Sequence, residues 1–240
     1  MKSLIALAAV FAATSSLVAA DATGLDDVKN AAQKLAAADN YSWTTTIDST
    51  QFRPGPSHGK TEKGGFTYVD FSMRDDTVEA VIKDGKGAIK TEDGWVSLDA
   101  AAKNDGGGGF NPAMFIARRL QNYKMPAGEA VDMAGLAKEL TKSEDVYSGD
   151  LTEDGAKKLL RFGRRGGAGG GGEGPAISNA KGSVKFWVKD GILTKYQYKV
   201  QATITRNGED TDVDRTTTVE IRDVGTTKVT VPDEAKSKLS

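Results

Sequence analysis

The stretch that decides the fold is residues 182–224, GSVKFWVKDGILTKYQYKVQATITRNGEDTDVDRTTTVEIRDV. Apolar residues alternate with polar or charged ones along most of it, which is the two-residue period of a half-buried strand. The dipeptides Asp190-Gly191 and Asn207-Gly208 interrupt the alternation, and both favour the tight turns of antiparallel hairpins. The stretch therefore predicts three consecutive antiparallel strands, of which the middle one, 192–205, is unusually long.

The same period extends towards the N-terminus. Residues 41–48 alternate in this way, and further strands are predicted at 65–73, 77–83, 87–91 and 95–98. Short turns such as Asp84-Gly85 join them, which leaves no room for the helical crossovers that parallel strands need. A last strand is predicted about 228–231, followed by a terminal helix. We predict an α+β fold built on one layer of antiparallel sheet.

Helical spacing appears at the start and in the middle of the chain. Residues 25–36 carry a single apolar stripe and predict a leading helix. Asn111 and Pro112 offer an N-cap and a first-turn proline to a central helix that runs to 123. After Pro126, an apolar stripe that reaches Leu140 predicts a second central helix. Residues 145–150 favour a short strand, and Thr152 caps a short helix that ends near 160.

The N-terminal residues 1–20 read as a secretory signal peptide. Lys2 precedes an apolar run that is short for a membrane span, and Val18 and Ala20 place small side chains at the positions that signal peptidase inspects. A membrane anchor is the alternative interpretation. The rest of the chain, 21–240, shows no internal boundary and is expected to be a single exported domain.

Composition excludes several classes of function. The 240 residues include no cysteine and one histidine, which excludes thiolate metal sites, disulfides and multi-histidine centres. The formal net charge of -1 gives no general attraction for nucleic acid. We predict no cofactor, no metal and no nucleic-acid partner, and no integral membrane segment after signal cleavage.

Several short motifs resemble chemical sites, but each lacks its context. Residues 54–61, PGPSHGKT, nearly match a phosphate loop, yet Pro54 replaces the first glycine and no helix follows. His58 in the same segment is expected to be an exposed imidazole in a polar loop. Asp210, Asp212 and Asp214 resemble half of a calcium loop without its glycine and glutamate. No catalytic residue is predicted, and the protein is not expected to be an enzyme.

The glycine-rich run 163–175, GRRGGAGGGGEGP, matches G-x-G-x-x-G by composition alone. No strand-to-helix unit surrounds it, so we interpret it as a flexible loop. Arg164 and Arg165 in this run could contact an acidic group, although solubilising charge is the simpler interpretation.

Four segments together resemble the LolA-like superfamily of exported lipid and lipoprotein carriers. They are GSVKFWVKDGILTKYQYKVQATI, TTTVEIRDVGTTKVTVP, PDEAKSKL and, earlier in the chain, DGKGAIKTEDGWVSLDAA. The resemblance covers most of the chain after the signal peptide as an order of elements. It implies an open half-barrel, in which a strongly curved antiparallel sheet has an apolar concave face covered by the central helices. It also implies a cavity for acyl chains between the sheet and the helices, and a location in the periplasm. No lipid-anchor cysteine is present.

The predicted ligand site combines this implied concave face with the alternation of the strands. Its strand residues and two helical residues are expected to point together. They are Trp43, Phe66, Tyr68, Ile116, Leu120, Phe186, Tyr196 and Tyr198. The leading hypothesis is a soluble exported carrier or sensor that binds a lipid or acyl chain without chemistry. The alternatives are a protein-protein interaction module with a filled core, with envelope proteins as partners, and an exported hydrolase.

Overall fold

The computed structural model describes residues 24–51, 54–73, 76–103, 111–121, 123–162 and 176–239. The predicted signal peptide, 1–20, and the predicted flexible loop, 163–175, lie outside the described residues. The strands are β1 Asn40–Ser49, β2 Ser57–Glu62, β3 Thr67–Met73, β4 Asp76–Lys83, β5 Lys86–Thr91, β6 Gly94–Ser97, β7 Thr141–Ser143, β8 Val146–Asp150, β9 Ala176–Lys189, β10 Ile192–Arg206 and β11 Glu209–Arg222. The helices are α1 Gly24–Ala37, α2 Leu98–Lys103, α3 Pro112–Leu120, α4 Pro126–Ala134, α5 Glu153–Phe162 and α6 Asp233–Ser237.

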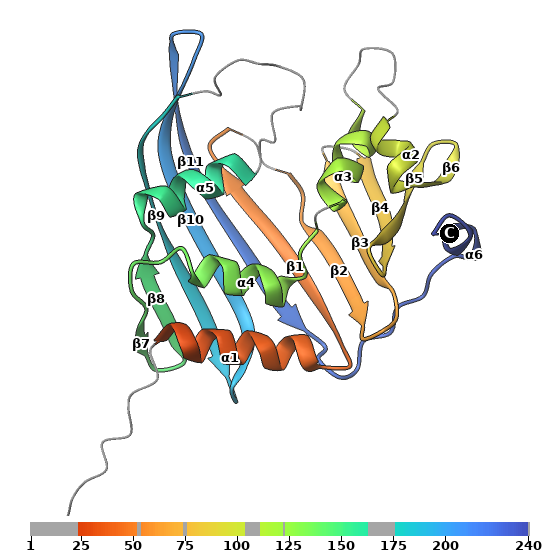
Figure 1. Ribbon diagram of the computed structural model, residues 1–240, viewed down its shortest axis with the longest axis horizontal. Helices are drawn as coiled ribbons and strands as arrows, with labels where there is room; N and C mark the ends of the chain where they lie inside the picture. Colours follow the sequence, from red (N-terminus) through yellow and green to blue (C-terminus); the bar gives the residue numbers. More distant parts are fainter. Residues whose placement is uncertain are drawn as a thin grey trace, which may run out of the picture.

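All of these strands form one antiparallel sheet in the order β6-β5-β4-β3-β2-β1-β11-β10-β9-β8-β7 (Figure 1). The sheet is open, because β6 and β7 are its edges and do not pair with each other. β1 joins the two halves of the chain, since it pairs with β2 on one side and with β11 on the other. The predicted α+β fold with a single open half-barrel sheet is confirmed.

The tight turns of the long strands lie where the sequence predicts them. Asp190 and Gly191 have φ of 54° and 73°, and Asn207 and Gly208 have φ of 52° and 83°. Asparagine, aspartate and glycine tolerate this left-handed backbone better than other residues, so each dipeptide closes its hairpin without strain. These two turns connect β9, β10 and β11, which form the longest ladders of the sheet. The register of β10 with β11 is unbroken, whereas that of β10 with β9 shifts between Leu193 and Lys195 and again between Gln201 and Thr203.

Two predicted helix starts are also confirmed. The backbone N–H of Met114 donates to Asn111 Oδ1 at 3.1 Å, which caps α3, and Pro112 occupies its first turn. The backbone N–H of Gly155 donates to Thr152 Oγ1 at 2.9 Å at the start of α5.

Other boundaries differ from the prediction. α4 ends at Ala134, with Gly135 as its C-cap, so the apolar stripe towards Leu140 continues outside the helix. Residues 228–231 form no strand. Leu98, predicted as the end of a strand, instead begins α2. The expected polar loop around His58 is in fact β2, a central strand whose apolar period is missing because Gly59 occupies its main inward position.

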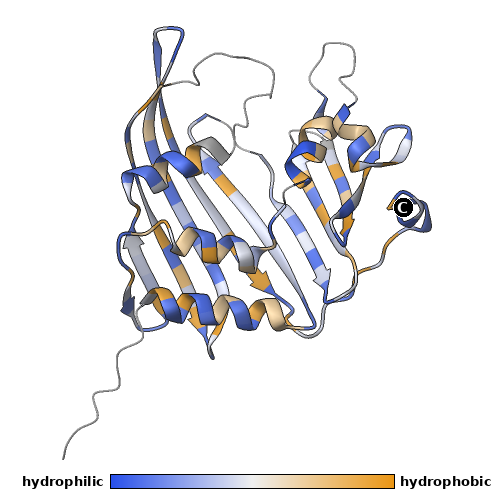
Figure 2. Ribbon diagram, viewed as in Figure 1, coloured by the Kyte–Doolittle hydropathy of each residue, from blue (hydrophilic) through white to orange (hydrophobic). Residues whose placement is uncertain are grey.

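The five helices α1 to α5 lie on one face of the sheet, which we call the inner face (Figure 1). α1, α4 and α5 pack against β9 and β10, whereas α2 and α3 pack against β4, β5 and β6. The leading helix α1 thus joins the predicted central helices in covering the sheet. Apolar and polar residues alternate along strands and helices alike (Figure 2), and the apolar ones build a large core between the sheet and these helices.

A smaller core lies on the opposite, outer face. α6 and the segment that leads to it pack there against β5 and β6. Val81, Ala88, Trp95, Val231 and Ala235 form this core. The edge of the sheet near β6 is therefore covered on both faces.

Candidate ligand-binding site

The helices on the inner face form two separate groups. α1 packs on α4, and α2 packs on α3, while α3 and α4 contact each other little although they are adjacent in the chain. In Figure 1, the first group lies over β8 to β11 and the second over β3 to β5. The inner face is therefore covered by two helix groups that make few contacts with each other, and α5 packs beside the first group against β9 and β10.

Six of the eight residues predicted to line the site share the inner core. Trp43 on β1, Phe186 on β9 and Tyr196 on β10 are buried, as are Ile116 and Leu120 on α3. The rings of Phe186 and Tyr196 stack, with centroids 6.5 Å apart. Tyr198 is partly buried and packs against the same core. Whether these residues contact a ligand stays a prediction.

Phe66 and Tyr68 do not lie with the other six, and their predicted placement on the concave face is wrong. Both pack against the outer core, and the Tyr68 hydroxyl donates to Glu79 at 3.0 Å. The reason is the register of β3. Val69 pairs with Gly59, and a side chain at Gly59 would point towards the inward indole of Trp43. Paired residues share a face, so the odd-numbered residues of β3 point inward. Val69 and Phe71 take the inward places instead.

A polar cluster that the sequence did not predict lies in the inner core. We call it the tyrosine-glutamate cluster; it consists of Tyr41, Tyr123, Glu129, Tyr196 and Tyr198. The Tyr196 hydroxyl donates to Glu129 Oε2 at 2.5 Å, and the Tyr198 hydroxyl lies 3.5 Å from Oε1. Glu129 belongs to α4 and both tyrosines to β10, so these contacts connect a helix of the first group directly to the sheet.

The rest of the cluster lies in the region between the two helix groups. Tyr123, in the segment between α3 and α4, lies close enough to Glu129 and Trp43 for both to influence its pKa. The backbone of Ala127 in α4 likewise influences the pKa of Tyr41 on β1. Tyr198 stands opposite Thr217 of β11 in the ladder. The cluster thus spans the middle of the sheet, between the two helix groups.

Burial decides the ionisation of the cluster. It raises the pKa of Tyr41 to about 12, and it raises the pKa values of Tyr123, Tyr196 and Tyr198 well above the usual tyrosine range. These tyrosines therefore remain hydroxyl donors at physiological pH. Burial also raises the pKa of Glu129, against the hydrogen bond from Tyr196 and the nearby Arg119 charge, which favour its ionised form.

Glu129 could have been noticed in the sequence. Pro126 and Met133, three residues before it and four after it, are both buried, so Glu129 occupies the inward stripe of α4. A carboxylate at such a position usually needs a partner. Its place in the first turn of the helix, where acidic residues are common for electrostatic reasons, hides this signal.

A groove of about 360 Å³ runs between α1 and α4 on the side away from the sheet. Small or apolar residues form most of it, among them Ala32, Ala36, Ala127 and Val131, and the ion pair of Lys124 with Asp132 belongs to its rim. Its volume is at the lower end of the range of small-molecule sites. The groove shows that α1 and α4 pack through short side chains.

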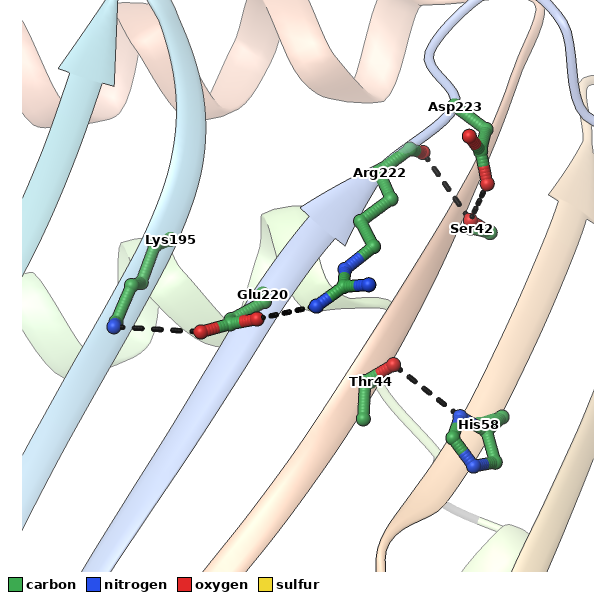
Figure 3. Close-up of polar contacts among 7 residues, drawn as sticks. All are labelled: Ser42, Thr44, His58, Lys195, Glu220, Arg222 and Asp223. Carbon is green, nitrogen blue, oxygen red and sulfur yellow. Dashed lines mark hydrogen bonds and ion pairs between the residues drawn. The ribbon is translucent and has the colours of Figure 1, made fainter.

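The outer face over the middle of the sheet is polar (Figure 3). Lys195 and Arg222 contact Glu220 at 3.4 and 2.8 Å, and Ser42 donates to Asp223 at 2.8 Å. His58 Nδ1 lies 3.2 Å from Thr44 Oγ1, and the imidazole is exposed. These contacts lie within β11 or between neighbouring segments of a solvated face, and among the described residues they gather no chemical site around His58.

The three aspartates of the calcium-like pattern also serve the sheet. Asp210 and Asp212 accept hydrogen bonds from threonines on the neighbouring strand β10, at 2.6 and 2.9 Å. Asp214 accepts from Gln201 at 2.7 Å and pairs with Lys199. Because each carboxylate bonds separately to the opposite strand, their side chains do not converge.

No protein-family model and no curated protein matches the sequence. Among solved structures, LprF from Mycobacterium bovis aligns over 88% of this chain and 97% of its own, with 10% identity and a TM-score of 0.44. A LolA superfamily protein from Nitrosomonas europaea aligns over 88% of this chain and 96% of its own, with 9% identity and a TM-score of 0.31.

Proposed function

We propose that the protein is an exported carrier or sensor that holds an apolar ligand, such as a lipid or an acyl chain, between its sheet and its helices. It performs no chemistry in this proposal. The observation that carries it is the division of the inner cover into two helix groups that make few contacts with each other above a large apolar face. A cover built this way can part along one line without unfolding either group.

The energetics favour a chain-like apolar ligand. Each buried methylene contributes about 0.8 kcal/mol, so eight methylenes would contribute about 6 kcal/mol. This gain has to exceed the cost of moving α4 away from β9 and β10. An acyl chain can then replace the contacts that the helix loses.

The exported location rests on the sequence. Residues 1–20 have the charged start, apolar run and small-residue end of a signal peptide. Within the described residues, no helix combines the length and the hydrophobicity needed to cross a bilayer. We propose the periplasm as the location and a lipid-bearing envelope component as the source of the ligand.

A specific observation favours a second function, an interaction module with a filled core. Phe186 and Tyr196 have no exposed surface, and Trp43, Ile116 and Leu120 are at most 4% exposed. In this closed form the inward side chains already pack against one another and expose almost no surface. If the helices never part, the polar outer face or the sheet edges would be the surfaces that meet a partner.

Ligand extraction distinguishes the two functions. Protein purified from its native envelope is expected to carry lipid that mass spectrometry detects after extraction, and to bind the fluorescent probe phenylnaphthylamine saturably. Tyr198→Asp, which places a charge beside Glu129, is expected to weaken probe binding at least about tenfold, a loss of about 1.4 kcal/mol.

The matched control is Gln197→Asp, on the same strand but on the outer face, where Gln197 bonds to Thr218. It is expected to bind the probe like the wild type. Circular dichroism and thermal unfolding identify variants that are merely unfolded. Wild-type protein that carries no lipid and binds no probe would establish the filled core and contradict the carrier.

A further inference from the structure

Glu129 fastens the covering helix α4 to β10 through the hydroxyls of Tyr196 and Tyr198. A similar contact joins Asp27 of α1 to Tyr147 of β8 at 2.9 Å, but burial raises the pKa of Glu129. Tyr196 is fully buried, so its hydroxyl cannot reach water while α4 is in place. If α4 moved away, Tyr196 would lose its acceptor and Glu129 would gain access to solvent. The contact is therefore sensitive to the position of α4.

We infer that proton binding to Glu129 regulates access to the inner face, so that the cover stays closed in acid and opens more readily as the pH rises. The inference rests on the proposed function in one respect, namely that the opened face is the ligand site. The opening itself is a property of the chain and can be measured without a ligand.

The sign follows from solvation. An ionised carboxylate is costly to bury, whereas a protonated carboxyl is not. In the closed form, burial raises the pKa of Glu129; in an open form, water would return it towards the usual value of about 4.3. The closed form therefore holds the proton more tightly, and acid favours it. At pH values above the pKa of Glu129 in the open form, the ionised carboxylate is stabilised by contact with water, so the open form becomes more populated.

The groups around Glu129 reduce the rise in its pKa that burial causes, but they do not reverse it. Tyr196 and Tyr198 on β10 and Arg119 on α3 favour the ionised form, while Asp132 on α4 itself opposes it. Tyr123, before α4, interacts with Glu129 but stays protonated, because its own pKa is raised. The charge of Arg215 on β11 lowers the pKa of Tyr198, which in turn contacts Glu129. Desolvation remains the largest influence on Glu129.

The sequence contains no cysteine, so a single introduced cysteine is the only thiol that a labelling reagent can modify. Ala130, next to Glu129 on α4, and Ala117 on α3 are both fully buried. Ala130→Cys places a thiol under the helix that should move, and Ala117→Cys places a matched thiol under the other group. Labelling by a maleimide is followed between about pH 5 and about pH 8. Each rate is divided by that of an unstructured thiol peptide, which removes the titration of the thiol itself.

The normalised labelling of Ala130→Cys is expected to rise with pH, about tenfold for each unit by which closure raises the pKa of Glu129. In the Glu129→Gln background, which keeps the shape of the side chain without its charge, the rate should not vary with pH. Ala117→Cys should show no rise in either background. A flat profile for Ala130→Cys, the same rise in Glu129→Gln, or an equal rise at Ala117→Cys overturns the inference.

The proposed function and the proton-regulated opening can fail separately. If phenylnaphthylamine binds equally well across this pH range and labelling is flat, the carrier stands and the regulation is wrong. If labelling at residue 130 depends on pH through Glu129 but no probe or lipid binds, the opening is real and the carrier is wrong. His58 is the one histidine of the sequence and lies on the outer face. A His58→Gln variant that keeps the rise excludes it as the cause, and one that loses the rise refutes the role of Glu129.

Discussion

Replacing Phe186 by alanine is expected to lower the free energy of unfolding by about 3–5 kcal/mol, which is the usual cost of removing a fully buried aromatic side chain. Phe186 has no exposed surface, stacks on Tyr196 and stands opposite Tyr147 in the neighbouring strand. The large effect arises because β9 and β10 cannot collapse into the space, since their turn and their long ladder fix them. Urea unfolding followed by circular dichroism measures the change.

The matched control for Phe186→Ala is Trp187→Ala. Trp187 is the next residue on β9 and points to the outer face, where it is partly exposed and stacks with Lys195. Its removal is expected to cost clearly less, about 1 kcal/mol, because a partly exposed side chain leaves no sealed cavity. If the larger loss followed Trp187→Ala, our assignment of the inner and outer faces of β9 would be wrong.

Gly59→Ala is expected to destabilise the protein by about 1–3 kcal/mol through overpacking. A Cβ at residue 59 would lie 2.0 Å from Trp43 Cζ2 and 2.1 Å from Cε2, so the indole would have to move. Trp43 is itself 4% exposed and packed against Tyr41, so it has little room to do so. Thermal or urea unfolding of Gly59→Ala measures this cost.

A double-mutant cycle with Trp43→Leu shows whether the indole is the cause. The smaller side chain should make Gly59→Ala nearly neutral, which gives a coupling energy of at least about 1 kcal/mol. Gly128→Ala on α4, where a Cβ would meet open space, is the control for a general effect of replacing glycine. It should be neutral or slightly stabilising. Additive effects of Gly59→Ala and Trp43→Leu would contradict the contact.

The strands that face water on one side could be predicted well from the sequence. In β9, β10 and β11, alternation and the Asp190-Gly191 and Asn207-Gly208 turns agree, so the pairing of the strands, though not the two register shifts between β9 and β10, follows from local signals. The same holds for the start of α3, where Asn111 and Pro112 act through backbone chemistry alone. In each case the nearest residues in sequence determine the structure.

Prediction failed where burial on both faces removes the alternation. β3 is covered by helices on its inner face and by the segment before α6 on its outer face. Val69 therefore packs in the inner core, and its neighbour Tyr68 packs against the outer core. Period-two reasoning then cannot tell which set points inward, and a shift of one residue exchanges the faces. β2 was missed for the opposite reason: its inward residue Gly59 has no side chain, because Trp43 of β1 fills that place.

The tyrosine-glutamate cluster depends on distant pairing and could not be assembled from local patterns. Glu129 and Tyr196 are 67 residues apart and meet because α4 crosses β10. The alternation of the strands identifies Trp43, Tyr196 and Tyr198 as inward residues. The inward position of Glu129 on α4 does not by itself indicate that its carboxylate meets the tyrosines of β10. The polar part of the candidate site therefore emerges only from the tertiary structure.

The most direct test of the carrier uses the three tryptophans of the chain. Trp43 lies on the inner face, while Trp95 and Trp187 belong to the outer face. In Trp95→Phe/Trp187→Phe protein, Trp43 is the sole reporter, and a brominated acyl chain quenches an indole only on contact. Our account predicts saturable quenching of Trp43 that unbrominated chains compete away, and no saturable quenching in Trp43→Phe/Trp95→Phe protein, where Trp187 reports. Absence of quenching at Trp43, or equal quenching of Trp187, would contradict a ligand site between the sheet and the helices.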